Sequence, residues 1–426
     1  MIRSATRISV LCAGLIGTTS AVAQDWPIFR GPTGDGHVAA KNLPLKWSST
    51  ENIAWHVDLP GKGWSSPILV AGKLYFTAAK VIGDGKESDP KANRQLTTVC
   101  LDAATGKTLW DVMVFDQSGE KAPGSIHQKN SHASPTPVFH EGKLYVHFGH
   151  QGTACLDLNG KKVWENRQLN YQPQHGGGST PIIVDGKLIF TCDGREEQYI
   201  AALRISDGQV AWKFKRPTNA RQKFSFCTPE CITVNGKKMV ITPGADIVNA
   251  LDPATGSEIW HVNYEGYSVV PKPVYGNGLV YVASSFDTPD VLAIKPDGKG
   301  DVTATHVAWQ VDSKKRPPCT PSMILDGKNL FWVSDGGLAS CVDALTGESL
   351  WCERVGKGFS ASPILADGKI YFLDEAGLCT VVEASRTFKV LAENKLENER
   401  TLASLAATEG TLFLRTETGM YCIKAK

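Results

Sequence analysis

Apolar and polar residues follow a pattern that repeats eight times along the chain. In each copy an apolar run precedes a short glycine turn, and an aromatic-rich run follows it. The turns are Ala71-Gly72-Lys73, Glu141-Gly142-Lys143, Asp185-Gly186-Lys187, Asn235-Gly236-Lys237, Asn277-Gly278, Asp326-Gly327-Lys328, Asp367-Gly368-Lys369 and Glu409-Gly410. Asn-Gly and Asp-Gly pairs supply the positive φ angles that tight hairpins need, so each copy predicts a β-hairpin.

The spacing of these hairpins predicts the fold class. They recur about every 40–50 residues with about four strands per copy, which is typical of propeller blades. We therefore expect an all-β protein, an eight-bladed β-propeller with four-stranded antiparallel blades.

A tryptophan closes most copies after a second turn, as in Cys100–Trp110 with the sequence CLDAATGKTLW. A large flat side chain on the outermost strand suits packing between neighbouring blades. The predicted structural tryptophans are Trp55, Trp110, Trp164, Trp212, Trp260, Trp309 and Trp351.

The eighth copy is incomplete, because the chain stops at Lys426 before a fourth strand. Residues 51–59, with Trp55 at the motif position, look like the missing strand. We expect this N-terminal strand to close the last blade and so remove an open sheet edge. Residues 24–426 then form one domain, in which residues 24–50 are an N-terminal extension.

The repeated pattern [AC]-L-D-x-x-T-G-x-x-x-W resembles the tryptophan-docking motif of PQQ-type eight-bladed propellers. That family contains quinoprotein alcohol dehydrogenases and BamB-like assembly lipoproteins, so the resemblance implies the fold and leaves the activity open. The segment Asp25–Pro32, followed by Leu43-Pro44, Trp47 and the Gly61–Pro67 run, is similar to exported PQQ-like repeat proteins of planctomycete-type bacteria.

Residues 1–23 are predicted to be a cleavable signal peptide. Arg3 and Arg7 lead an apolar stretch that ends in Ala21-Val22-Ala23. We therefore expect a periplasmic or secreted protein, without a membrane span. Removal of the peptide leaves 43 basic against 43 acidic residues, a balance that argues against nucleic-acid binding. We also expect a monomer.

Ten cysteines remain after Cys12 is removed with the signal peptide. Several alternate with alanine or valine in one repeat position, which is typical of small buried side chains. Equivalent positions in different blades lie too far apart for a disulfide. Most are predicted to be free thiols, with Cys341 and Cys352 as the exception.

Long loops precede the inner strands, on the face called the top, whereas the bottom turns are short. Binding residues usually lie on such loops. Our candidates for contact with a ligand or partner are Trp64, Lys129, His132, His175, Arg221, Lys314, Arg316 and Lys357. If the basic residues converge, they favour an anionic ligand or an acidic partner; the alternative is that they are simply solvated.

No catalytic residues can be identified from the sequence. Asp193, Glu196 and Glu197 lie in a top loop and are expected to be solvated. The loop histidines have no acidic or thiol ligand at a suitable spacing, so no metal is predicted. We expect a non-catalytic scaffold without a cofactor that binds a protein partner or an anionic small molecule. The alternative, implied by the resemblance, is a dehydrogenase with PQQ and Ca²⁺ that oxidises alcohols or sugars.

Overall fold

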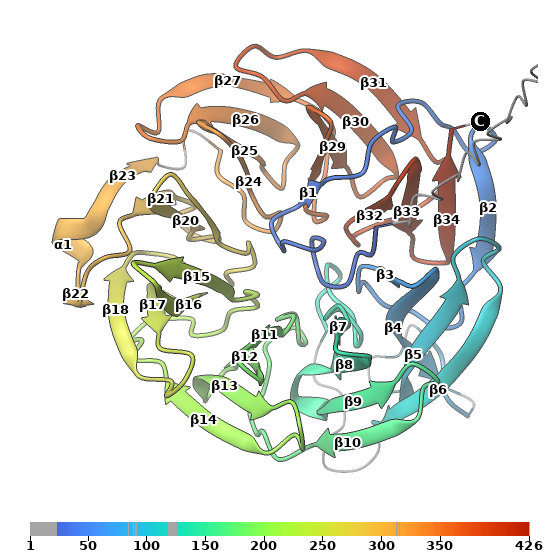
Figure 1. Ribbon diagram of the computed structural model, residues 1–426, viewed down its shortest axis with the longest axis horizontal. Helices are drawn as coiled ribbons and strands as arrows, with labels where there is room; N and C mark the ends of the chain where they lie inside the picture. Colours follow the sequence, from blue (N-terminus) through green and yellow to red (C-terminus); the bar gives the residue numbers. More distant parts are fainter. Residues whose placement is uncertain are drawn as a thin grey trace, which may run out of the picture.

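The strands surround a central axis as eight separate sheets (Figure 1). The computed structural model describes residues 24–83, 85–87, 89, 92–117, 126–311, 314 and 316–425; the predicted signal peptide lies outside these ranges. Every sheet contains four antiparallel strands. The predicted eight-bladed, all-β propeller is therefore confirmed.

Blades 1 to 4 follow one another along the chain. Blade 1 comprises β3 (Ile68–Val70), β4 (Lys73–Val81), β5 (Arg94–Asp102) and β6 (Thr108–Asp116), and blade 2 comprises β7 (Val138–His140), β8 (Lys143–His147), β9 (Thr153–Asp157) and β10 (Lys162–Asn166). Blade 3 comprises β11 (Ile182–Val184), β12 (Lys187–Asp193), β13 (Gln198–Arg204) and β14 (Val210–Lys215), and blade 4 comprises β15 (Glu230–Val234), β16 (Lys237–Gly244), β17 (Ile247–Leu251) and β18 (Glu258–Asn263). The 3₁₀-helix η2 (Gly149–Gln151) lies in blade 2, between β8 and β9.

Blades 5 to 8 complete the ring. Blade 5 comprises β19 (Val274–Gly276), β20 (Leu279–Ala283), β21 (Val291–Ile294) and β23 (Val307–Val311), and blade 6 comprises β24 (Ile324–Asp326), β25 (Asn329–Val333), β26 (Leu338–Asp343) and β27 (Ser349–Arg354). Blade 7 comprises β28 (Ile364–Ala366), β29 (Lys369–Leu373), β30 (Leu378–Glu383) and β31 (Val390–Lys395), and blade 8 comprises β32 (Ala406–Thr408), β33 (Thr411–Arg415), β34 (Gly419–Lys424) and β2 (Ile53–Asp58). Helix α1 (Thr303–His306) precedes β23.

Two short strands extend this plan. Strand β1 (His37–Val38) pairs in parallel with the inner strand β28, and β22 (Gly300–Asp301) pairs in parallel with the outer strand β18. Blades 7 and 4 therefore have five strands each.

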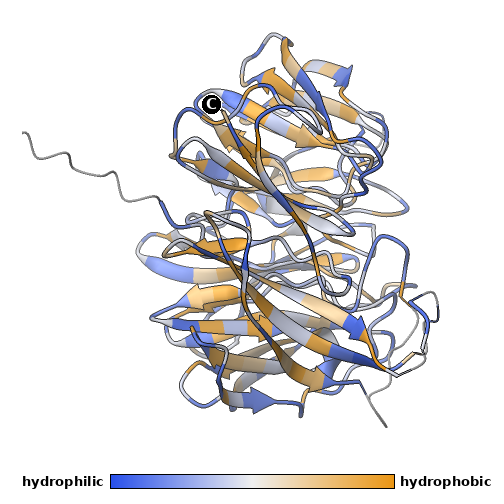
Figure 2. Cartoon of the chain, turned by 90° about the vertical axis from the view of Figure 1, so that its right-hand side faces the viewer, coloured by the Kyte–Doolittle hydropathy of each residue, from blue (hydrophilic) through white to orange (hydrophobic). Residues whose placement is uncertain are grey.

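The inner hairpin turns have the predicted geometry. In six of them both turn residues have positive φ, for example Asp185 at 47° and Gly186 at 71°. These angles match the right-handed twist of the flanking strands. The hydrophobic residues lie mainly along the strands, as Figure 2 shows, and one core cluster joins Tyr75 and Leu96 of blade 1 to Leu144 and Val146 of blade 2.

Each predicted tryptophan reaches into the following blade. The Nε1 atoms of Trp55, Trp110, Trp164, Trp212, Trp260, Trp309 and Trp351 donate to main-chain carbonyls there, at N–O distances of 2.8–3.1 Å. Five of these indoles also lie against the glycine of the next blade's outer turn: Gly106, Gly160, Gly208, Gly256 and Gly347. The predicted packing of the tryptophans between neighbouring blades is confirmed, and the outer turn of each following blade is the surface that most of them contact.

Blade 7 has Ala392 where the other blades have tryptophan, paired with Val381 of the adjacent strand. Trp47 of the extension lies there instead. Its ring stacks on Tyr371, with centroids 6.4 Å apart, and its main-chain N–H donates to Oδ1 of Asn394 at 2.8 Å. The extension therefore supplies the indole that the blade itself lacks.

Both ends of the chain close the ring. Strand β2 pairs antiparallel with β34, and Trp55 faces Cys422, which confirms the predicted closure. The extension itself lies along inner strands near the bottom turns. It bonds to blade 1 through Trp26 and Leu69, to blade 2 through Pro27 and Phe139, and to blade 7 through Gly36 and Leu365.

All ten cysteines of residues 24–425 are free thiols, so the general prediction is confirmed. The predicted exception is wrong. Cys341 pairs with Trp351 across the hairpin, and Cys352 pairs with Ser340. Cys352 therefore shares a face of the sheet with Ser340. Because neighbouring residues of a strand, such as Ser340 and Cys341, point to opposite faces, the two thiols lie on opposite faces; Cys341 is buried and Cys352 is exposed.

Candidate functional site

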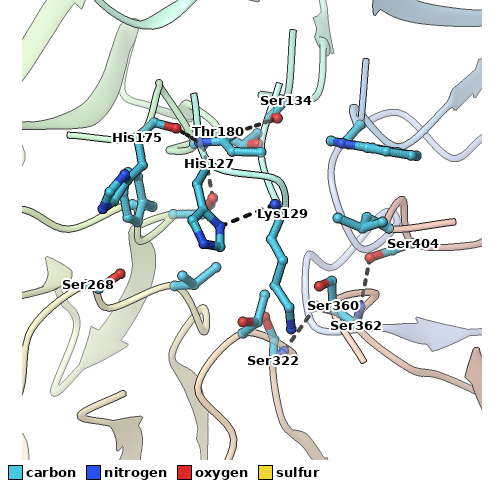
Figure 3. Close-up of a pocket in the computed structure, with 18 of the residues that line it drawn as sticks. His127, Lys129, Ser134, His175, Thr180, Ser268, Ser322, Ser360, Ser362 and Ser404 are labelled. Atoms are coloured by element: carbon cyan, nitrogen blue, oxygen red, sulfur yellow. Dashed lines mark hydrogen bonds between the residues drawn. The ribbon is translucent and has the colours of Figure 1, made fainter. Parts of the chain in front are cut away.

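A cavity of about 330 Å³ lies at the top end of the central channel (Figure 3). All eight blades contribute to its lining through the segments that precede their inner strands, and Phe29 of the extension joins them. The volume falls within the range of small-molecule sites.

Three of the eight predicted contact residues line this cavity: Trp64, Lys129 and His175. Five others do not: His132, Arg221, Lys314, Arg316 and Lys357. Lys129 is the one Lys or Arg side chain in the lining described by the structure. The basic residues therefore do not converge into a ring around the cavity, since most of their side chains leave the loops toward solvent.

Lys129 is already paired with two carboxylates. Its Nζ lies 2.9 Å from Glu375 Oε1 and 3.2 Å from Asp335 Oδ2. Burial lowers the pKa of Lys129, but the two carboxylates outweigh this effect and raise the pKa above its usual value. Asp335 is held in turn by the main-chain N–H groups of Cys319 and Thr320. The lysine is therefore a fixed cation that joins blades 2, 6 and 7.

His132 lies in a separate small cavity of about 10 Å³. Its Nδ1 lies 3.1 Å from Nε2 of Gln117. Burial, with a smaller contribution from Arg94, lowers the pKa of His132 to about 4. This imidazole is neutral at pH 7 and does not add to the positive charge of the top face.

The other predicted cations lie on the exposed rim. Arg221 is 78% exposed and pairs with Asp287 at 3.1 Å. The side chains of Lys314, Arg316 and Lys357 are exposed as well. Their contact with a partner stays a prediction.

One wall of the cavity is aromatic, which the sequence analysis did not anticipate. This aromatic wall consists of Phe224, Phe226, Tyr267 and Phe286. The ring of Phe224 lies 5.5 Å from that of Tyr267 and 5.5 Å from that of His175. The available signal was the aromatic residues in the loops before the fourth and fifth inner strands and in the loop between β20 and β21.

A second missed feature is a circle of hydroxyl groups at the start of the inner strands. This hydroxyl ring consists of Ser66, Thr136, Thr180, Thr228, Ser322, Ser362 and Ser404, all of which line the cavity. Each hydroxyl oxygen accepts a hydrogen bond from the main-chain N–H of the residue at the equivalent position in the preceding blade, at N–O distances of 2.9–3.1 Å. These bonds connect neighbouring blades around the channel. Blade 5 has Lys272 at the equivalent position, so the ring is open there. The signal was a Ser or Thr that usually precedes Pro.

Trp64, which lines the cavity, contacts Arg400 of blade 8. The guanidinium carbon of Arg400 lies 5.4 Å from the ring centroid of Trp64, and its Nη2 donates to the carbonyl of Gln128 at 2.7 Å. A cation over an indole face is attracted by the ring quadrupole. The pair holds Trp64 in place in the lining of the cavity.

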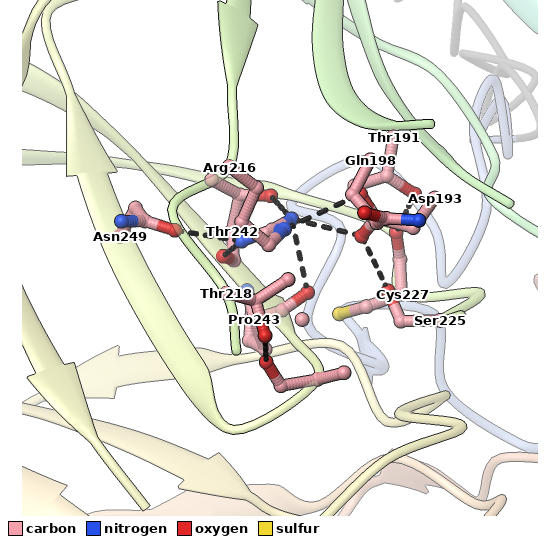
Figure 4. A network of polar contacts seen from close by, with 12 residues as sticks. Thr191, Asp193, Gln198, Arg216, Thr218, Ser225, Cys227, Thr242, Pro243 and Asn249 are labelled. Carbon is pink, nitrogen blue, oxygen red and sulfur yellow. Dashed lines mark hydrogen bonds and ion pairs between the residues drawn. The ribbon is translucent and has the colours of Figure 1, made fainter. Parts of the chain in front are cut away.

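The expectation for Asp193 is wrong. Its carboxylate is buried and pairs with Arg216, with Nη2 and Oδ2 3.0 Å apart (Figure 4). It also accepts a hydrogen bond from Ser225 Oγ at 2.7 Å. Arg216 further donates to Asn249 and to the carbonyl of Thr242. This network links blades 3 and 4, whereas Glu196 and Glu197 are exposed as expected.

Within the described ranges, no three His, Cys, Asp or Glu side chains are grouped so that they could hold a metal ion. The described part of the chain also contains no helix with the length and apolar character of a membrane span.

Comparison with known proteins places the chain among related sequences. A tetrathionate hydrolase of Acidithiobacillus ferrooxidans is 21% identical over 360 residues, which are 76% of this chain. An uncharacterized protein of Rickettsia conorii is 25% identical over 205 residues, or 36% of this chain. The matched regions span 65% and 48% of the lengths of those relatives.

Solved structures share the fold at low identity. BamB from Moraxella catarrhalis superimposes with a TM-score of 0.58 and 13% identity, covering 88% of this chain and 99% of its own. A europium-containing methanol dehydrogenase gives a TM-score of 0.65 and 11% identity, covering 94% and 98%. At these identities, both structural similarities show the shared propeller fold alone.

The sequence model of one family matches residues 34–227 and 298–425, which is more than half of the chain. This match agrees with the tryptophan-docking repeat and with the eight blades observed. The chain therefore belongs to the family of PQQ-like propellers described as outer membrane protein assembly factor BamB.

Proposed function

We propose that the protein is an exported, non-catalytic binding protein that takes a small ligand into the cavity at the top of its channel. The observation that carries this proposal is the cavity itself, about 330 Å³ and lined from every blade. A site built on eight rigid blades holds its lining groups in fixed positions without a moving lid.

The composition of the lining supports ligand binding. The aromatic wall offers flat apolar surface on one side, and the indole of Trp64 offers another in the same lining. Hydroxyl groups and Lys129 supply polar contacts on the remaining sides. Mostly apolar lining with a few placed polar groups is the usual arrangement of small-molecule sites.

Export to the periplasm or outside the cell is part of the proposal, which rests here on the predicted signal peptide. The exposed rim residues Arg221, Arg316 and Lys357 are available to an acidic protein partner. Such a partner would approach the same face and would cover the mouth of the cavity.

The alternative, a PQQ-dependent dehydrogenase, needs a site for PQQ and Ca²⁺. The residues present do not fit that pair. PQQ carries three carboxylates, whereas the one Lys or Arg in the described lining is Lys129, already paired with Asp335 and Glu375. A Ca²⁺ ion needs several oxygen ligands, including carboxylates, and the described lining contains no Asp or Glu. Its side chains therefore favour binding without this cofactor.

The binding proposal is tested by native mass spectrometry of the protein purified from its own cells. The wild type should retain a small molecule, and the double variant Trp64→Ala/Phe224→Ala should lose it. The variant Lys143→Ala, at a bottom turn, is the control and should retain it. Wild-type protein that carries no small molecule but a bound protein chain would overturn ligand binding in favour of partner docking.

The dehydrogenase alternative has a separate test. Protein incubated with PQQ and Ca²⁺ should not reduce a dye acceptor in the presence of alcohols or aldose sugars. Reproducible turnover that requires both additions would replace the binding proposal with the enzymatic one.

A further inference from the structure

The hydroxyl ring has unused hydrogen-bonding capacity. Each of its seven oxygens accepts one main-chain N–H, as described above, and the exposed fractions of these residues are 2–6%. Within the described chain, none of the seven hydroxyls donates a hydrogen bond to a protein acceptor. A buried donor without a partner costs free energy, so these groups need an acceptor from outside the chain.

The geometry makes these donors converge. The seven residues come from seven blades and line one cavity, and Figure 3 shows Thr180, Ser322, Ser362 and Ser404 around it. Since each oxygen is oriented by its bond to the neighbouring blade, the remaining hydrogen is the group left to face the channel.

A buried cation lies beside this ring. Arg30 of the extension is 1% exposed, and its Nη2 donates to the carbonyl of Met323, the residue after Ser322. Its Nε and Nη1 atoms have no partner among the described residues. Burial lowers the pKa of Arg30 to about 10, with a smaller opposing effect of Asp35, so the group is charged at neutral pH.

The negative groups near the cavity are engaged elsewhere. Asp335 and Glu375 pair with Lys129, and neither lines the cavity. Glu230 pairs with Lys272, which also donates to the carbonyl of Gly34 at 2.8 Å. The cavity is therefore lined by hydroxyl groups around the channel and by aromatic rings from blades 4 and 5, without a carboxylate among its described lining residues.

We infer that the cavity takes an oxyanion carried on a flat apolar group, with the oxyanion on the hydroxyl ring and the flat part against the aromatic wall. This inference rests on the proposed binding function and names the class of its ligand. Hydrogen bonds to a charged acceptor are about twice as strong as those between neutral groups. The carboxylate and the sulfonate share this chemistry.

Four probes of similar size test the inference on the full chain: benzoate, benzenesulfonate, benzamide and benzylamine. Binding is followed by saturation-transfer NMR, with dissociation constants from titration. We expect one or both oxyanions to bind at least about tenfold more tightly than benzamide, which corresponds to about 1.4 kcal/mol. The two oxyanions identify whether carboxylate or sulfonate is preferred.

Two adjacent residues provide a matched pair of variants. Thr180→Ala removes a ring hydroxyl and should weaken oxyanion binding about tenfold, while Thr180→Ser should restore it. Ser179→Ala removes a neighbouring buried hydroxyl whose hydrogen already goes to the carbonyl of Cys227. This control should leave the affinity unchanged, even where it lowers thermal stability.

Equal or tighter binding of benzamide or benzylamine would overturn the inference but leave the binding function standing. Failure of all four probes would also overturn it, while the retained ligand in native mass spectrometry decides the proposed function independently. If Thr180→Ala does not fold, the probe preference of the wild type alone decides the inference.

Discussion

The indole of Trp164 lies against the backbone of Gly208, so that a Cβ atom at this glycine would fall 2.4 Å from the indole Cε3. The same contact recurs between other blades, with a glycine of positive φ facing the preceding tryptophan. Glycine is needed there for two reasons, conformation and space, and the two can be separated by experiment.

Gly208→Ala should destabilise the protein more than Gly186→Ala. Both glycines have φ near 70°, at 73° and 71°, so both variants pay about 1–2 kcal/mol for the left-handed conformation. Only Gly208 adds a clash, because the Cβ at Gly186 would meet nothing within 4 Å. The further loss should be about 1–3 kcal/mol, measured by chemical denaturation. Equal losses would show that the indole moves freely.

The substitute indole in blade 7 leads to a second prediction. Trp260 and Trp47 are both almost fully buried, but only Trp260 has an acceptor for Nε1, the carbonyl of Pro296. Trp260→Phe should therefore cost about 1 kcal/mol more than Trp47→Phe, the usual value of a hydrogen bond. Thermal and urea unfolding of both variants measures the difference. A larger loss at Trp47 would mean that its Nε1 bonds to water.

Acid should destabilise the protein through a buried histidine. Burial, with a smaller effect of His150, lowers the pKa of His147 to about 3 in the folded state, against about 6.5 when unfolded. The unfolded state binds the proton more readily than the folded state. The contribution of His147 to the free energy of unfolding is therefore fully present above pH 6.5 and is lost as the pH drops toward 3. The expected loss at pH 4 is roughly 3 kcal/mol.

The variant His147→Gln should show a flatter dependence of unfolding free energy between pH 6.5 and 4. His140→Gln, at a partly exposed position, controls for the loss of an imidazole. An unchanged slope in His147→Gln would show that this imidazole is protonated without unfolding.

The buried pair of Asp193 and Arg216 gives a fourth prediction. Arg216→Met should cost about 3–5 kcal/mol, because it leaves a buried carboxylate without its cation. The double variant Asp193→Asn/Arg216→Met should recover part of this loss. A double-mutant cycle in urea measures the coupling, and strictly additive losses would contradict it.

The fold could be predicted because its signals are local. Residues a few positions apart, such as Asp185 and Gly186, determine each hairpin, and the repeat shows how many there are. The packing of Trp164 between neighbouring blades could be inferred in the same way, since a tryptophan recurs at one position of the repeat.

The site was only partly predictable. Lys129 was identified as a loop cation, but its partners Asp335 and Glu375 lie more than 200 positions along the chain. The aromatic wall and the hydroxyl ring depend on the closed ring, which brings the starts of distant strands together. The spacing of residues within one repeat does not indicate which loops meet across the channel axis.

The pairing of β2 with β34 has a consequence for how the chain reaches its folded state. The partners are some 360 positions apart in sequence, with Trp55 opposite Cys422. During synthesis from the N-terminus, β2 must stay unpaired until β34 has been synthesised and has reached it. Folding should therefore end with a slow long-range step, and until that step an open ring with a free strand edge is the species most exposed to aggregation and proteolysis.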